Sequence, residues 1–122
     1  MGFENFLVDK NNNAITWQFN GELISVACQD LDNAYLFSKN NLILALVGKK
    51  NYPEMLIGFN EKGTRKFEVN APEGFQFAYL TEHPTAGVAV VCGSDERVDG
   101  WMDWHFAVDP VTGELKRHCP AY

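Results

Sequence analysis

The segment GSDERVDGWMDWHF, at positions 93–106, holds the residues of this sequence best suited to binding another molecule. From Asp95 to Asp109 there are five acidic residues and one basic residue, a net charge of −4, with two tryptophans among them. A tryptophan at an interface buries a large area, and carboxylates speed the encounter with a Lys- or Arg-rich protein and pair with it. The segment therefore predicts a contact surface for a basic protein, with an ordinary acidic loop around a half-buried tryptophan as the alternative.

Alternation along a strand assigns the side chains of this segment to two faces. We expect an exposed face made of Trp101, Asp103 and His105, and a core face made of Met102, Trp104 and Phe106. A smaller acidic turn in CQDLDN extends the predicted surface. The predicted partner-binding residues are Asp95, Glu96, Asp99, Trp101, Asp103, Asp30 and Asp32.

The same segment also holds residues that could bind a metal ion. Asp95, Asp99 and Gly100 fit positions one, five and six of a calcium loop, but Arg97 and Phe106 stand where oxygen ligands are required. A set made of Asp99, Asp103 and His105 is conceivable, although it mixes ligand types and has no second cluster nearby in the sequence. The expectation is therefore no metal and no cofactor.

Catalytic motifs are scarce in this chain. It contains no GxGxxG, GxxxxGK, HExxH or CxxC motif. His118 and Cys119 are adjacent, which suggests a nucleophile and its base, but neighbours on a strand point to opposite faces. The sequence therefore predicts a surface histidine, a strand-end cysteine and a protein that is not an enzyme.

Short apolar runs separated by Gly, Asn, Asp and Pro predict strands and turns rather than helices. A single weak helical alternative falls on Asp30–Ser38, and the almost wholly apolar run Asn41–Val47 predicts a strand covered on both faces. The expected strands lie near Glu4–Val8, Ala14–Phe19, Glu22–Cys28, Ala34–Ser38, Leu42–Val47, Glu54–Phe59, Thr64–Val69, Phe75–Leu80, Val88–Cys92, Trp101–Val108 and Glu114–His118.

A strand that ends in an acidic or amide residue, followed by a turn and a second strand, recurs along the chain. Asn60 lies 51 residues after Asp9, and Asp109 lies 49 residues after Asn60. The Asx side chain can accept a hydrogen bond from the backbone two residues on, and Gly63 and Gly113 suit positive φ in the later turns. In the first turn, Asn12 or Asn13 takes that place.

A period of roughly 40–50 residues with about four strands per unit is typical of β-propeller blades. The chain, a single domain of residues 1–122, holds about three such units, whereas closed propellers need about four to eight. We therefore expect an all-β fold of antiparallel meanders in an open half-propeller, with a β-sandwich as the alternative. Such an arc leaves sheet edges and faces for a partner to cover.

Overall composition narrows the partners. The chain has 16 Asp and Glu against 10 Lys and Arg, which disfavours direct nucleic-acid binding and anionic membranes. Its N-terminus has neither the basic start nor the apolar run of a signal peptide, and its three cysteines cannot all pair internally. We expect a cytoplasmic protein with reduced thiols.

The short chain, the partial repeats at Asp9, Asn60 and Asp109, and the acidic-aromatic segment resemble the small immunity proteins of bacterial toxin systems, including those that guard against contact-dependent growth inhibition toxins. The resemblance implies a non-enzymatic inhibitor that binds a basic toxin domain, expected to be a nuclease, through carboxylates that cover its nucleic-acid site. Asp99, Trp101 and Asp103 are the expected central contacts. The alternative function is a propeller-like module that assembles with itself, as a homodimer, and binds a small ligand or peptide.

Overall fold

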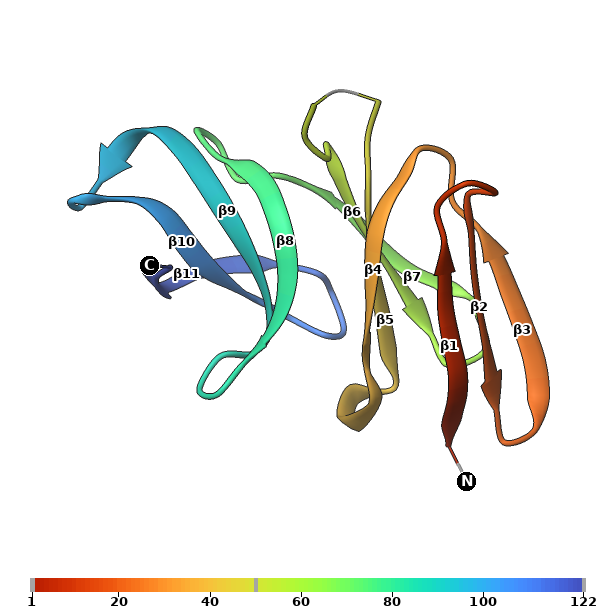
Figure 1. Cartoon of the computed structure of the whole chain (residues 1–122). Coiled ribbons are helices and arrows are strands. Elements are labelled where there is room, and N and C mark those ends of the chain that lie inside the picture. The colour runs from red at the N-terminus through yellow and green to blue at the C-terminus, as the bar shows by residue number, and fades with distance from the viewer. Residues whose placement is uncertain (1, 50, 122) are drawn as a thin grey trace.

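Eleven strands dominate the computed structural model, which describes residues 2–49 and 51–121 (Figure 1). A 3-10 turn, η1 (Ser38–Asn40), is the one helical element within these residues. The strands are β1 (Phe3–Asp9), β2 (Ala14–Phe19), β3 (Glu22–Ala27), β4 (Leu31–Phe37), β5 (Leu42–Val47), β6 (Met55–Asn60), β7 (Arg65–Asn70), β8 (Gln76–His83), β9 (Gly87–Val98), β10 (Trp101–Val108) and β11 (Leu115–Pro120).

The structure confirms the all-β class and each predicted strand. The helical alternative for Asp30–Ser38 is wrong, because this stretch pairs with β5 as strand β4. None of the elements formed by the described residues is a helix long and apolar enough to cross a membrane.

The strands form three antiparallel sheets that follow one another along the chain. The first sheet has the order β1-β2-β3, the second β4-β5-β6-β7 and the third β11-β10-β9-β8, and none of them closes on itself within the described residues. The sheets lie side by side with their faces opposed (Figure 1), and β4, from the second sheet, contacts both β1 and β8. This arrangement is consistent with three blades of an open arc and with the alternative of packed sheets in a β-sandwich.

Strand β5 lies at the centre of the packing. Leu42, Leu44 and Leu46 belong to the apolar cluster between the second and third sheets. Ile43 and Ala45 belong to the cluster between the first and second sheets. All five are fully buried, which confirms the prediction that this run is covered on both faces. Full burial of each Leu or Ile stabilises the fold by about 1.5–3 kcal/mol.

The repeated Asx turns are present, although their blade positions differ. The Asn60 side chain accepts hydrogen bonds from the Lys62 and Thr64 backbone, and the Asp109 carboxylate accepts from Val111 and Thr112. Asn60 ends the third strand of a four-stranded sheet and Asp109 directly follows one, whereas Asp9 ends the first strand of its sheet. The second and third sheets therefore repeat the same order of strands and turn, and the copy at Asp9 matches them in turn chemistry alone.

The turn after the third strand of each repeat packs on the sheet before it. Gly63 has φ +85° and Gly113 has φ +79°. A Cβ on Gly63 would lie 2.9 Å from methyl carbons of Ile24 and Val26, and one on Gly113 would overlap the Phe67 ring. These glycines let successive sheets approach closely.

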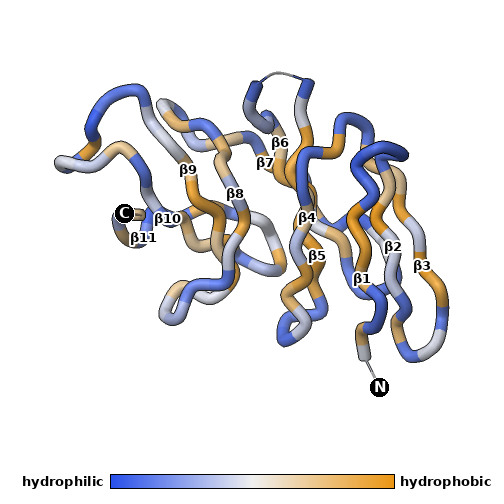
Figure 2. Tube along the Cα trace, viewed as in Figure 1, coloured by the Kyte–Doolittle hydropathy of each residue, from blue (hydrophilic) through white to orange (hydrophobic). Residues whose placement is uncertain are grey.

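The outer faces of the two end sheets carry both polar and apolar residues. In the first sheet, Thr16 and Gln18 alternate with buried Ile15 and Trp17, and their cross-strand neighbours Leu7 and Leu23 are exposed. In the third sheet, the outer face carries histidines and a cysteine. The hydrophobic segments gather where sheets face each other, and hydrophilic stretches lie toward the turns (Figure 2).

Candidate functional site

The predicted acidic-aromatic segment forms a two-stranded arm, residues 94–103, that extends beyond the third sheet. Pairing of β8 with β9 begins at Gln76 and Gly93, and pairing of β11 with β10 ends at Trp104 and Pro120. Past these points only β9 and β10 continue, and Figure 1 shows them projecting from the body of the molecule. Their pairing is irregular here: Val98 pairs with Trp101 and Gly93 with Asp103, so residues 94–97 of β9 lie opposite Met102 alone. The arm is strongly hydrophilic along its β9 side (Figure 2).

A tight turn at Asp99 and Gly100 closes the arm. Both residues have positive φ, +49° and +90°, and Val98 pairs with Trp101 across them. Asp-Gly is a favoured pair for a two-residue hairpin whose central residues both need positive φ. The Asp-Gly pair is a sequence signal for this turn, although the spacing of the two residues also fits calcium-loop positions. The predicted strand Val88–Cys92 ends before the observed end of β9 at Val98.

Trp104 anchors the base of the arm. Its indole Nε1–H lies 3.1 Å from the Val98 carbonyl oxygen and 3.2 Å from the Trp101 carbonyl oxygen, so it donates to both strands beside the turn. The Arg117 guanidinium lies 4.5 Å from the centroid of the Trp104 ring and donates a hydrogen bond to the Asp99 carboxylate. These contacts give the arm a defined conformation before any partner binds.

The structure exposes the predicted contact residues of the arm. Asp95, Glu96, Asp99 and Asp103 are exposed, and Trp101 is 42% exposed. Met102, predicted as core, is 43% exposed, because no second sheet faces the arm beyond Trp104. Trp104 and Phe106 are buried as predicted.

A hollow at the base of the arm gathers further negative charge. Its lining includes Glu73 and Phe75, from the segment before β8, together with Asp95, Glu96 and Arg97 from the arm. Three carboxylates around a partly buried aromatic ring form a setting that suits an incoming Lys or Arg side chain. Sequence reasoning missed Glu73 and Phe75, which lie about twenty residues before the arm.

The structure does not bring Asp30 and Asp32 to the arm. They lie where β3 leads into β4, and Asp30 lines a separate hollow with Lys49 and Arg65. The β3–β4 connection and the arm are far apart in Figure 1. The expectation of one continuous acidic surface is therefore wrong: short acidic turns in different sheets end up apart.

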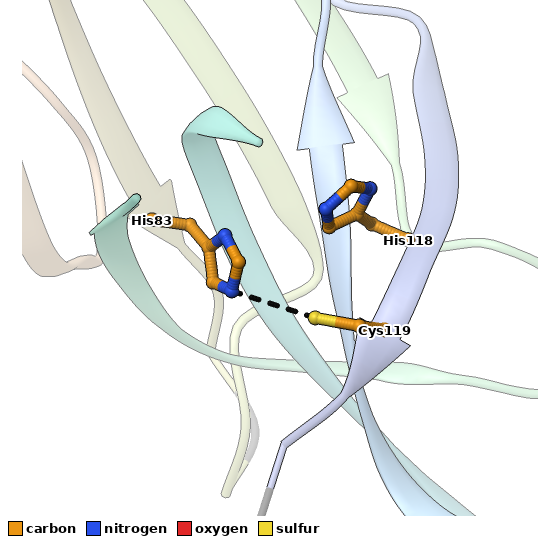
Figure 3. Close-up of side chains that lie close together, drawn as sticks. All are labelled: His83, His118 and Cys119. Carbon is orange, nitrogen blue, oxygen red and sulfur yellow. Dashed lines mark hydrogen bonds between the residues drawn. The ribbon is translucent and has the colours of Figure 1, made fainter. Parts of the chain in front are cut away.

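A second cluster, unforeseen from the sequence, unites His83, His105, His118 and Cys119, and so all three histidines of the chain. The Cys119 Sγ lies 3.4 Å from His83 Nε2 and 3.7 Å from His105 Nδ1 (Figure 3 shows His83, His118 and Cys119). In the pairing of β10 with β11, His105 opposes Cys119 and Phe106 opposes Arg117, so His118 is the extra residue of a β-bulge. A bulge interrupts strict alternation, which is why the expectation that His118 and Cys119 point apart is wrong.

Hydrogen bonds fix the proton on His83. Its Nδ1 accepts from the backbone N–H groups of Thr85 and Ala86, both at 3.1 Å, so in the neutral ring Nε2 carries the hydrogen. Loss of solvent contact, and then the charges of His105 and His118, lower the pKa of His83, which favours this neutral form. His83 Nε2–H therefore donates toward the Cys119 sulfur.

The donor and acceptor roles of the two His83 ring nitrogens are the reverse of those in a histidine that binds a metal. Ligand atoms of His83, His118 and Cys119 all lie within 4.8 Å of one another. A histidine that binds a metal donates its other ring N–H to an acceptor, whereas His83 Nδ1 faces two donors. The possible metal ligands Asp99, Asp103 and His105 are not brought together either. Asp99 pairs with Arg117, whereas His105 lies against Cys119.

No family model matches the chain, and neither the curated proteins nor the solved structures contain a significant match. The resemblance to immunity proteins therefore stays a prediction.

Proposed function

We propose that this protein is a non-enzymatic inhibitor that binds a basic protein domain through the arm. The observation that carries the proposal is that the arm projects from the fold with Trp101 and Met102 exposed among four carboxylates. Tryptophan and methionine are enriched at protein interfaces relative to the rest of the surface, whereas scattered acidic residues alone are ordinary. The combination favours a docking element over a solvated loop.

The order of the arm supports tight binding. A segment that is already fixed loses less conformational entropy on association than a mobile loop does. The Trp104 indole and the Arg117 guanidinium hold both strands of the arm and its turn. Trp101 can then act as an anchor, while the surrounding carboxylates raise the association rate.

The charge of the arm indicates the kind of partner. Four acidic residues and one basic residue within positions 94–103 favour a surface rich in Lys and Arg. A nuclease-type toxin domain has such a surface where it holds phosphates, and carboxylates can occupy it in their place. In this proposal the protein acts as an immunity protein, in a reducing cytoplasm that suits its three free cysteines.

A second candidate rests on the uncovered ends of the arc. The outer faces of the first and third sheets have no sheet packed on them among the described residues. Two copies joined end to end would give six sheets, within the range of about four to eight blades in closed propellers. A homodimer of this kind would create a central channel for a small ligand or peptide.

The deciding experiment tests the protein against the product of the neighbouring gene, in pull-down with purified proteins and in a growth-protection assay. Trp101→Ala with Asp103→Ala should weaken binding by about a hundredfold or more and abolish protection. The matched control, Glu4→Ala with Leu7→Ala, removes an acidic residue and an exposed apolar residue from the first sheet and should leave both intact. Light scattering that shows a stable dimer, lost in the control variant, would instead establish the second candidate.

A further inference from the structure

The outer face of the third sheet brings together side chains from opposite corners. In register, Tyr79, Val91, His105 and Cys119 follow one another across the four strands. His83 lies four residues beyond Tyr79, at the far end of β8, yet its ring reaches Cys119. A twisted sheet raises one pair of diagonal corners toward the same face, and the third sheet is strongly twisted between β8 and β11 (Figure 1).

The contacts join the three histidines and Cys119 in one set. The Thr85 hydroxyl oxygen lies 2.9 Å from His118 Nε2 and 3.2 Å from His83 Nδ1, and so links these two rings. His83 Nε2–H donates to Cys119 Sγ, and the Cys119 thiol can pass its proton to His105 Nδ1. The backbone donors at Thr85 and Ala86 fix the direction of the His83–Cys119 hydrogen bond, because they leave His83 Nδ1 no role but acceptor.

We infer that Cys119 is a nucleophilic thiol and a site of covalent modification by hydroperoxides and other soft electrophiles. A cysteine reacts as the thiolate, and a histidine that takes its proton, with a second donor at the sulfur, stabilises that form. Cys119 has both neighbours and is partly exposed. The inference is independent of the arm and of the proposed inhibitor function.

The reaction with a hydroperoxide begins at the Cys119 thiol and its neighbour His105. His105 takes the thiol proton, and the sulfur attacks one peroxide oxygen, so that an S–O bond forms as the O–O bond breaks. The sulfur is oxidised by two electrons to a sulfenic acid, and the hydroperoxide is reduced. The leaving oxygen takes the proton from His105 and departs as water or an alcohol.

The other two cysteines provide internal controls. Cys28 and Cys92 are fully buried. Burial raises the pKa of the Cys28 thiol, although Arg65 opposes the shift, and burial raises the pKa of Cys92 to about 12. Both should be inert in the folded protein, so selectivity among the three thiols can be read within one molecule.

Four side chains with titratable groups face or flank Cys119. His83 comes from β8, His105 from β10 and His118 from β11, and exposed Asp103 lies two residues before His105. The labelling rates of all variants are therefore compared at a single pH of about 7, near the ordinary histidine range. A difference in rate then reflects the substitution and not a difference in pH.

The test is alkylation by iodoacetamide followed by peptide mass spectrometry. In the folded protein, Cys119 alone should be labelled, and at a rate above that of the same residue in the denatured chain. His83→Gln and His105→Gln should each slow labelling by about tenfold. His118→Gln, which acts on the sulfur only through Thr85 and His83, should slow it by much less.

A second readout uses hydrogen peroxide with dimedone as the trap for sulfenic acid. The adduct should form at Cys119 and be lost in Cys119→Ser. Labelling of Cys119 no faster in the folded than in the denatured chain would overturn the inference. Equal rates in all three histidine variants and the parent would overturn it as well.

Discussion

The Arg117 guanidinium donates a 2.6 Å hydrogen bond to the Asp99 carboxylate, eighteen residues before it in the sequence. The same guanidinium lies over the Trp104 ring. One residue of β11 thus holds both the turn and the base of the arm. Because Asp99 is already paired, the free charge for a partner comes mainly from Asp95, Glu96 and Asp103.

Arg117→Ala should loosen the arm while leaving the rest of the fold in place. Exposed ion pairs and exposed cation–π contacts each contribute about 0.5–1 kcal/mol, so the free energy of unfolding should fall by about 1 kcal/mol. Hydrogen exchange should speed up in residues 94–103. Arg97→Ala is the control: its guanidinium donates to the Gly100 carbonyl and does not join β11 to the arm, so this variant should change exchange less.

Trp17→Phe should weaken the contact between the first and second sheets. Trp17 is fully buried, and its indole Nε1–H donates a 2.8 Å hydrogen bond to the Glu61 carbonyl in the β6–β7 turn. Loss of this donor leaves a carbonyl less well satisfied and a partly empty volume, a cost of about 2 kcal/mol in urea unfolding. Trp101→Phe on the arm should cost less than about 0.5 kcal/mol. Equal losses would mean that Trp17 does not join the sheets.

Gly113→Ala should destabilise the protein far more than Gly74→Ala. Both glycines have similar positive φ, +79° and +82°, so the strain of placing an alanine there is matched. A Cβ at Gly113 meets the Phe67 ring, whereas nothing lies within 4 Å of one at Gly74. We expect about 1 kcal/mol for Gly74→Ala from backbone strain and at least twice that for Gly113→Ala, measured by thermal unfolding.

His83 should make stability depend on pH in the weakly acidic range. Its pKa in the folded protein is below the ordinary value of 6.5, so the unfolded chain takes up a proton first as the pH falls. The free energy of unfolding should therefore decline as the pH falls below 6.5. In His83→Gln this part of the decline should disappear, and a parent protein equally stable on both sides of pH 6.5 would contradict the lowered pKa.

The strands can be predicted from the sequence because the signals for strands and turns are local. Leu42–Val47 is apolar at every position and lies between two sheets, and the Asx residues at Asn60 and Asp109 make the turns that their chemistry predicts. The Asp9 copy matches the local pattern equally well but occupies another place in its sheet. Turn chemistry reports the local backbone and not the position of a strand within a sheet.

The candidate sites depend on features that have little local signal. Alternation along the strand correctly predicts that Trp101 is exposed and Trp104 is buried. It does not predict that the arm extends beyond the other strands of its sheet, which leaves Met102 exposed. The His83–Cys119 contact arises from a bulge at His118 and from sheet twist. Both are properties of strand pairing, which residue spacing does not show.

Hydrogen exchange of the protein, free and in complex with the basic domain captured in the pull-down, tests the central proposal most directly. Residues 94–103 should become protected on binding, together with the segment around Glu73 and Phe75 that shares their hollow. Protection confined to the first sheet or to the β3–β4 connection, with the arm exchanging as in the free protein, would contradict the proposal that the arm is the binding element.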